Sequence, residues 1–274
     1  IRKKVLIMSE KNSFPFDIPE LPDSVDNALK NLSDAPTKSI GQTLSDAWFL
    51  VFGGISHQAN KRRMKYAHDL EIYNYELSQA IANVPPENLI EPDIQTTAQA
   101  LENSKYCIES EELRKMFVNL ISKSVNCAYV EKVHPSFAEI IKQMSPLDAR
   151  ILKSMNPRYS FPLVDYVLSS STANKFRETF EINLSNVYIP NLSGVNIQQA
   201  SSSISSLSRL GIVTIETQST ITDSSVYAPY EQTDYYLEFS RKARQFYASK
   251  RADLHKYLGQ FTPLGKNFFE VCVK

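Results

Sequence analysis

The residue types that carry out most protein chemistry are present in this chain, but they do not stand at the spacings that metal or thiol chemistry requires. No two of the four histidines form a His-x-x-x-His pair, which would place two metal ligands on one helix face. The three cysteines form no Cys-x-x-Cys pair, and no local basic residues would stabilise a thiolate. We therefore expect no metal and no cofactor, and we expect all three cysteines to pack in the core: Cys107, Cys127 and Cys272.

Catalytic motifs are equally scarce. The chain has only seven glycines, and neither a phosphate-binding loop nor a Gly-x-Ser-x-Gly elbow nor a His-Glu-x-x-His motif occurs. The neighbouring carboxylates Glu111 and Glu112 fit the N-terminus of a helix, where they complement its dipole. The carboxylates Asp69 and Glu71 fit a solvated helix face. We predict no catalytic residues and a protein that is not an enzyme.

Charge is balanced over the whole chain and concentrated at one place. Thirty Lys and Arg match thirty Asp and Glu; residues 1–144 carry a net charge of −3 and residues 145–274 a net charge of +3. One dense basic cluster follows an apolar aromatic stretch. We interpret it either as a solvated helix face or as a patch that contacts a partner or an anionic surface, such as a membrane. The residues of this predicted patch are Trp48, Phe49, Phe52, Lys61, Arg62, Arg63 and Lys65.

The first half of the chain has the apolar periodicity of helices. Three prolines in residues 9–22 indicate an extended arm, and helical spacing follows over residues 23–32, 36–51 and 58–82. The clearest helix begins after Ser110, where an apolar stripe repeats every three or four residues as far as Ala128. Because Met8 resembles a translational start, we expect residues 1–7 to be an upstream extension.

The second half has a different composition, with more β-branched and aromatic residues and more turn-forming segments. Asn196 is placed to cap a helix that ends at Gly211, and the strand-like residues 212–216 follow. This order is typical of a winged helix, with an added helix near residues 231–254. We interpret the module as one that binds protein, with DNA binding as the alternative. The possible nucleic-acid contacts are Gln198, Gln199, Arg209, Arg241, Lys242 and Arg244.

These patterns predict a mainly α protein in which an N-terminal helical domain precedes a winged-helix-like α+β domain. The predicted limits are an arm over residues 1–22, a helical domain over 23–144 and the winged-helix-like domain over 145–274. The longest apolar stretch is much shorter than the roughly 20 residues of a membrane-spanning helix. We expect a cytoplasmic protein, with peripheral contact to the inner membrane as an option.

Five segments in register resemble the abortive infection alpha family of bacterial phage-resistance proteins. They lie at residues 36–48, 91–102, 111–121, 134–146 and 261–269, so the resemblance covers nearly the whole chain. The resemblance implies a role in defence against phage but brings no catalytic residues with it. We therefore expect a non-enzymatic component that self-associates or binds a protein partner and has no small-molecule substrate. The alternatives are a DNA-binding regulator and a membrane-acting effector.

Overall fold

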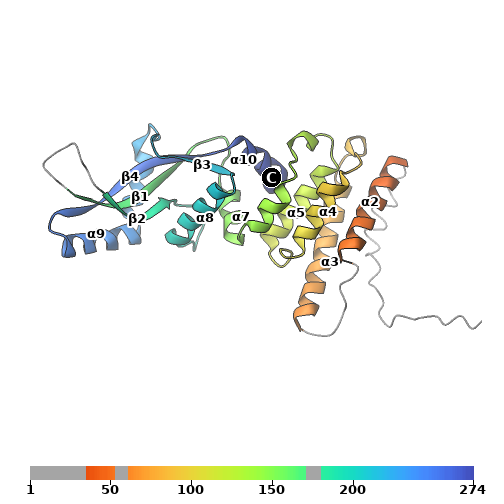
Figure 1. Cartoon of the computed structure of the whole chain (residues 1–274), viewed down its shortest axis with the longest axis horizontal. Helices are drawn as coiled ribbons and strands as arrows, with labels where there is room; N and C mark the ends of the chain where they lie inside the picture. The colour runs from red at the N-terminus through yellow and green to blue at the C-terminus, as the bar shows by residue number, and fades with distance from the viewer. Residues whose placement is uncertain (1–34, 53–60, 171–179) are drawn as a thin grey trace, which may run out of the picture.

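The computed structural model of this chain describes residues 35–52, 61–170 and 180–274. In Figure 1 the molecule is elongated, with a layer of helices at one end and a twisted sheet at the other. The predicted arm at residues 1–22 and the predicted helix at residues 23–32 lie outside the described residues.

The helical layer is built around one central helix. Its members are α2 (Ala35–Phe52), α3 (Lys61–Ala82), α4 (Ile94–Ser104), α5 (Glu111–Ser124) and α6 (Phe137–Gln143), with the short 3₁₀ turns η1 (Pro86–Asn88) and η2 (Val130–Lys132). Helix α5 packs against α3, α4 and α6. The Ser110 side chain caps it as predicted, and residues such as Phe117 and Ile121 are wholly buried. The helix ends at Ser124, one turn earlier than its apolar stripe predicts.

The sheet holds four antiparallel strands in the order β2-β1-β4-β3. Its strands are β1 (Phe161–Ser170), β2 (Phe180–Val187), β3 (Val213–Glu216) and β4 (Lys250–Phe261). Strands β1 and β4 pair along their whole length, from Phe161 opposite Gly259 to Ser170 opposite Lys250. A Cβ atom on Gly259 would lie 2.4 Å from the Phe161 ring, so any larger residue at this pairing would require the ring to move.

Two groups of helices pack against the sheet. Helices α7 (Pro146–Ser154) and α8 (Ile197–Arg209) pack together, and α8 also contacts β2 and β3. The 3₁₀ segment η3 (Ser224–Gln232) and α9 (Asp234–Phe246) enclose a second core with Val164, Tyr166 and Leu168 of β1. Alternate residues of β1 therefore face different cores, which is the expected consequence of strand geometry.

The described fold corrects the predicted fold class. It is an α+β fold rather than a mainly α one, because β1, β2 and β4 are long strands that the sequence pattern did not identify. The helix predicted near residues 231–254 ends at Phe246, and β4 begins at Lys250. Strand β1 is buried on both sides, so it lacks the alternation of polar and apolar residues by which a half-buried strand is recognised. A helix-turn-helix needs a helix just before α8, but β2 precedes α8 and no helix lies between them. The winged-helix topology is therefore not confirmed.

The C-terminal segment joins the sheet to the helical layer. After β4, α10 (Pro263–Phe268) and the π turn η4 (Phe269–Val273) run back onto α5 and α7. The Asn119 side-chain amide donates to the Cys272 carbonyl oxygen at 3.0 Å, and Lys123 Nζ donates to the Glu270 carbonyl oxygen at 2.7 Å. The Phe268 ring lies edge-on to Phe137, with centroids 5.1 Å apart. One apolar core consequently crosses the predicted boundary at residue 144.

We expect Phe268→Ala to lower the free energy of unfolding by about 3–5 kcal/mol, because it leaves a cavity where the C-terminal segment meets the helical layer. Phe246→Ala is the matched control, since Phe246 is 69% exposed and its loss should change stability by less than about 0.5 kcal/mol. Urea denaturation followed by circular dichroism measures both values. Equal effects of the two substitutions would contradict this account of the junction.

Candidate functional site

The start of α7 is fixed by side chains that also reach α8. Ser145 and Asp148 form a reciprocal capping box, in which the Ser145 backbone N–H donates to Asp148 Oδ2 at 2.8 Å. The Ser206 hydroxyl of α8 donates to the same carboxylate oxygen at 3.2 Å. Asp148 is almost fully buried, so this carboxylate serves both as a helix cap and as a link between the two helices.

Helix α8 presents one apolar side and one polar side. Asn196 caps its first turn, and Gly211 ends it with a φ of +74°, as predicted. Ala200, Ile204 and Leu207 are wholly buried, and Ser201 and Ser203 are buried beside them, whereas the two glutamines and Ser202 are exposed on the other side. The predicted contacts Gln198 and Gln199 lie there and line a cavity of about 410 Å³ between α7 and α8.

The predicted contact Arg209 lies on a surface made from three elements. Its guanidinium donates to Gln143 Oε1 at 3.0 Å, and the Gln143 amide nitrogen lies 3.5 Å from Glu139 Oε1. On the same helix α6, Lys142 Nζ stands 5.9 Å from the ring centroid of Tyr106, whose side chain is 75% exposed. We call this set the junction surface: Tyr106, Glu139, Lys142, Gln143 and Arg209.

The other predicted nucleic-acid contacts do not join this surface. Arg241, Lys242 and Arg244 are exposed on α9, which packs against β4 and η3, whereas α8 packs against α7, β2 and β3. Lys242 forms an ion pair with Glu238 at 2.7 Å, four residues earlier on the same helix. The structure therefore separates the six predicted contacts into two groups on different helices.

The predicted patch of aromatic and basic residues contains both buried and exposed side chains. The Phe52 ring is buried, and Trp48 is partly buried; both rings pack against Tyr73 of α3, with centroid separations of 6.3 and 5.4 Å. The exposed Lys65 pairs with Glu109 at 3.3 Å. Among the described residues of α2, the large apolar side chain that is exposed is Leu50. The side chains of the remaining patch residues lie outside the described part of the structure: Phe49, Lys61, Arg62 and Arg63.

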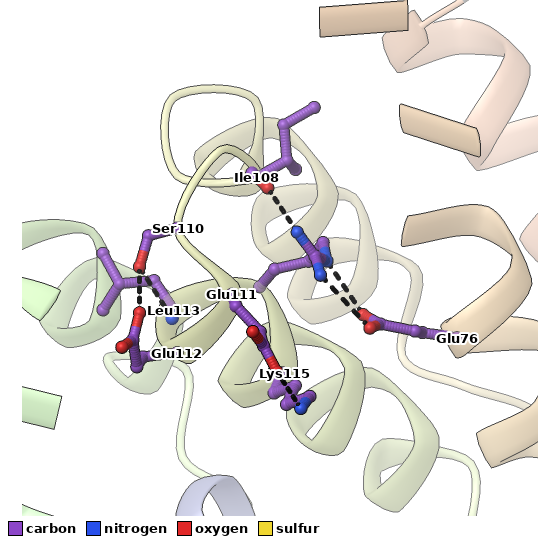
Figure 2. A network of polar contacts seen from close by, with 8 residues as sticks. Glu76, Ile108, Ser110, Glu111, Glu112, Leu113 and Lys115 are labelled. Atoms are coloured by element: carbon purple, nitrogen blue, oxygen red, sulfur yellow. Dashed lines mark hydrogen bonds and ion pairs between the residues drawn. The ribbon is translucent and has the colours of Figure 1, made fainter. Parts of the chain in front are cut away.

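A buried ion pair that the sequence did not indicate holds α3 to α5 (Figure 2). Arg114 donates to both carboxylate oxygens of Glu76, at 2.9 and 3.2 Å, and to the Ile108 carbonyl oxygen at 3.0 Å. Only 8% of the Arg114 side chain is exposed, and its hydrogen bonds to Glu76 raise the pKa of the guanidinium further. In sequence this arginine follows two glutamates at a helix start, where it resembles an ordinary surface residue.

Asp69 also departs from its prediction. Its neighbour Glu71 is exposed as expected, but Asp69 is buried in the helical layer. Its Oδ2 atom has no hydrogen-bond partner among the described residues, and its negative charge contributes to the raised pKa of Arg114. The Asp69 carboxylate therefore faces inward, near Arg114 of α5, whereas that of Glu71 faces solvent.

A second buried polar cluster joins three strands next to α8. The Tyr257 hydroxyl of β4 donates to Asp165 Oδ1 of β1 at 2.5 Å, and the Asn186 backbone N–H of β2 donates to the same oxygen at 3.0 Å. Asn186 has a φ of +53°, and its side-chain amide donates to Ser205 of α8. His255 Nδ1 lies 3.4 Å from the other Asp165 oxygen. Burial first, and Asp165 second, raise the pKa of Tyr257. Both carboxylate oxygens thus hold the sheet together.

Two of the three cysteines are buried and the third is exposed. Cys107 and Cys272 are buried, and burial raises the pKa of both thiols, but Cys127 is exposed, contrary to prediction. Within the described ranges, no three His, Cys, Asp or Glu side chains gather where they could hold a metal ion. Nor do these ranges contain a helix long and apolar enough to cross a bilayer.

The arrangement defines an α+β protein in which a helical layer and an antiparallel sheet share one core and an exposed polar surface spans their junction. The chain matches the abortive infection alpha family over residues 65–272 and belongs to that family. The family suggests involvement in abortive infection defence. No curated protein and no solved structure matches the chain.

We expect Glu76→Ala to destabilise the protein by about 3 kcal/mol, because it leaves the Arg114 guanidinium buried without its carboxylate partner. The matched control is Lys115→Ala, which breaks the solvent-exposed pair with Glu111 on the same helix and should cost less than about 0.5 kcal/mol. Chemical denaturation at pH 7 compares the two. A loss for Glu76→Ala as small as that of the control would show that the pair does not hold α3 to α5.

Tyr257→Phe tests the Asp165 cluster and its pH dependence. We expect a loss of about 1–3 kcal/mol at pH 7, because a buried carboxylate loses a donor. In the folded wild type the pKa of Tyr257 is raised, so its contribution is complete below about pH 10, where unfolded tyrosine titrates, and is lost as the pH rises further. The stability of the variant should therefore fall less steeply above pH 10 than that of the wild type. Tyr159→Phe, at a 69% exposed position, should leave the profile unchanged.

Proposed function

We propose that this protein acts in abortive infection defence without catalysing a reaction, by binding a protein partner through the junction surface. The observation that carries the proposal is the position of Tyr106. It is a large aromatic side chain with 75% of its surface exposed, beside Lys142 and on the same surface as Arg209. Tyrosine and arginine are enriched in protein interfaces, where they supply much of the binding energy.

The junction surface is also held in one arrangement. Glu139 accepts a hydrogen bond from Asn103 of α4 at 3.1 Å, so α6 is tied to the helical layer. The bond from Arg209 to Gln143 ties α8 to α6 across the predicted domain boundary. A surface whose side chains are fixed before binding loses less conformational entropy when a partner docks, which favours recognition.

The rival functions receive less support from these contacts. Binding of DNA through α8 requires cations for the phosphates, but Arg209 is already bonded to Gln143, and the cavity beside α8 contains the carboxylate of Asp148. Insertion of the predicted patch into a membrane requires its aromatic rings to be exposed, but of its described rings Phe52 is buried and Trp48 packs against Tyr73. A protein partner requires neither feature.

A double substitution on the junction surface tests the proposal. In a host where the wild-type chain restricts phage plating, we expect Tyr106→Ala with Arg209→Ala to reduce that protection at least tenfold. The matched control combines Tyr159→Ala with Arg241→Ala, which removes the same exposed residue types elsewhere. We expect the control to protect like the wild type. The measurement is the efficiency of plating, with equal protein abundance and thermal stability verified for each variant.

Three further results would contradict the proposal. The first is full protection by the junction variant. The second is a purified wild-type protein that stays monomeric at micromolar concentration and yields no cross-linked partner from infected cells. The third is a rival activity that the junction variant abolishes, namely a mobility shift of duplex DNA at low salt or flotation with anionic liposomes.

A further inference from the structure

An exposed turn joins α9 to β4 at the end of the molecule opposite α2 and α3 (Figure 1). Ala243 is the last residue of α9 that is buried in the second core, and all residues from 244 to 249 are exposed. The side chains at two neighbouring positions in this segment are large and aromatic. Phe246 is 69% exposed and Tyr247 is 43% exposed, so both present apolar surface to the solvent.

Positive charge flanks these aromatic residues on both sides in the sequence. Residues 239–252 contain no Asp or Glu and five Lys and Arg: Arg241, Lys242, Arg244, Lys250 and Arg251. The cations nearest in sequence to the aromatic pair and the pair itself form one set. We call this set the α9 tip: Arg244, Phe246, Tyr247, Lys250 and Arg251.

Neighbouring carboxylates neutralise only part of this charge. Three of the five cations form ion pairs with carboxylates: Lys242 with Glu238, Lys250 with Glu181 and Arg251 with Asp253. Arg251 keeps 70% of its side chain exposed within its pair. Among the described residues, Arg241 and Arg244 form no ion pair, and both are exposed. Five cations against three carboxylates leave an excess of two positive charges around the aromatic residues.

The order of these groups matches the structure of a lipid bilayer. In a bilayer a layer of phosphates covers an apolar interior, so a docked protein places apolar side chains between cations. The α9 tip has this order, because Phe246 and Tyr247 lie between Arg244 and Lys250 in an exposed segment. Tyrosine in particular is enriched at the boundary between membrane and water, where its ring is buried and its hydroxyl stays hydrated.

Nucleic acid fits the α9 tip less well. Single strands bind by stacking bases on aromatic rings, but the Tyr247 ring already has Lys250 Nζ at 5.4 Å from its centroid. Duplex DNA exposes its phosphates and the polar edges of its bases, so it offers little apolar surface to Phe246. Exposed apolar surface next to cations therefore favours a lipid surface over a nucleic acid.

We propose that the α9 tip docks on an anionic phospholipid membrane. The Phe246 ring enters the boundary between headgroups and acyl chains, the Tyr247 ring lies at the level of the headgroups, and Arg244 and Arg251 meet the lipid phosphates. The inference goes beyond the proposed function, because α9 packs against β4 and η3 and carries none of the residues of the junction surface.

Liposome flotation of the full-length protein tests the charge requirement. We expect the wild type to float with vesicles of phosphatidylglycerol and phosphatidylcholine in equal amounts and not with vesicles of phosphatidylcholine alone. Arg244→Glu with Arg251→Glu should weaken binding to the anionic vesicles about tenfold or more. The matched control is Arg150→Glu with Arg158→Glu, which makes the same change of charge at exposed positions outside the α9 tip. Because salt screens distant charges, the control should weaken binding by less than about threefold.

Fluorescence separates insertion of the α9 tip from adsorption by charge alone. Trp48 is the only tryptophan of the chain, and its ring packs against Tyr73 in the helical layer. We expect anionic vesicles with brominated acyl chains to quench part of the fluorescence of Phe246→Trp and none of that of the wild type. Phe246→Ala with Tyr247→Ala should weaken flotation about tenfold. Both side chains are exposed, so urea denaturation should show that this variant keeps the stability of the wild type.

The inference is overturned if the wild type does not float with anionic vesicles, if the tip variants float like the wild type, or if wild-type fluorescence is quenched as strongly as that of Phe246→Trp. It is also overturned if duplex or single-stranded DNA, or glycerol phosphate, displaces the protein from vesicles at equal phosphate concentration.

Flotation and the plating assay fail independently. The junction variant, Tyr106→Ala with Arg209→Ala, should float like the wild type. If it floats but protects fully against phage, only the proposed function is wrong. If it loses protection and the wild type does not float, only the membrane inference is wrong.

Discussion

The return of the C-terminal segment onto the helical layer is the contact on which the rest of the structure depends. Strand β4 leads into α10, and α10 lies so close to the start of β3 that a Cβ atom on Gly265 would stand 1.9 Å from the Ile212 carbonyl oxygen. Beyond this point Phe268, Val271 and Cys272 are completely buried. The side chains of Asn119 and Lys123 donate to the carbonyl oxygens of Cys272 and Glu270. The C-terminal segment is therefore anchored on α5 by hydrogen bonds as well as by apolar packing. The sheet and the helical layer consequently share one core.

The positions of the candidate surfaces follow from this anchoring. Helices α6, α7 and α8 lie where the sheet meets the helical layer, so the junction surface and the α7–α8 cavity include residues that are far apart in sequence. The buried polar groups on either side have a different role. Arg114 with Glu76, and Asp165 with Tyr257, satisfy one another within the fold, so they stabilise the two halves. These buried groups are therefore not the groups on which the proposed binding to a partner rests.

Membership of the abortive infection alpha family suggests involvement in abortive infection defence, but the family description brings no reaction with it. The physical character of the junction agrees with recognition. Its exposed aromatic ring and its mixed charges are the features that favour the proposed protein partner over a polyanion. The basic residues of α9 are a separate feature, on a helix that packs against another part of the sheet.

The sequence by itself determined the local elements. Caps at Ser110 and Asn196 and the left-handed Gly211 could be predicted because each depends on contacts within about four residues along the chain. The family could also be identified, and so could the helix that carries Gln198, Gln199 and Arg209; their role as nucleic-acid contacts stays a prediction. Only the tertiary structure decided that β1 lies between β2 and β4, that Phe52 and Asp69 point inward, and that Tyr106 shares a surface with Arg209. The reason is physical. Strand pairing and burial depend on partners that are far apart in sequence, such as Asp165 and Tyr257, and no pattern in the nearby sequence specifies them.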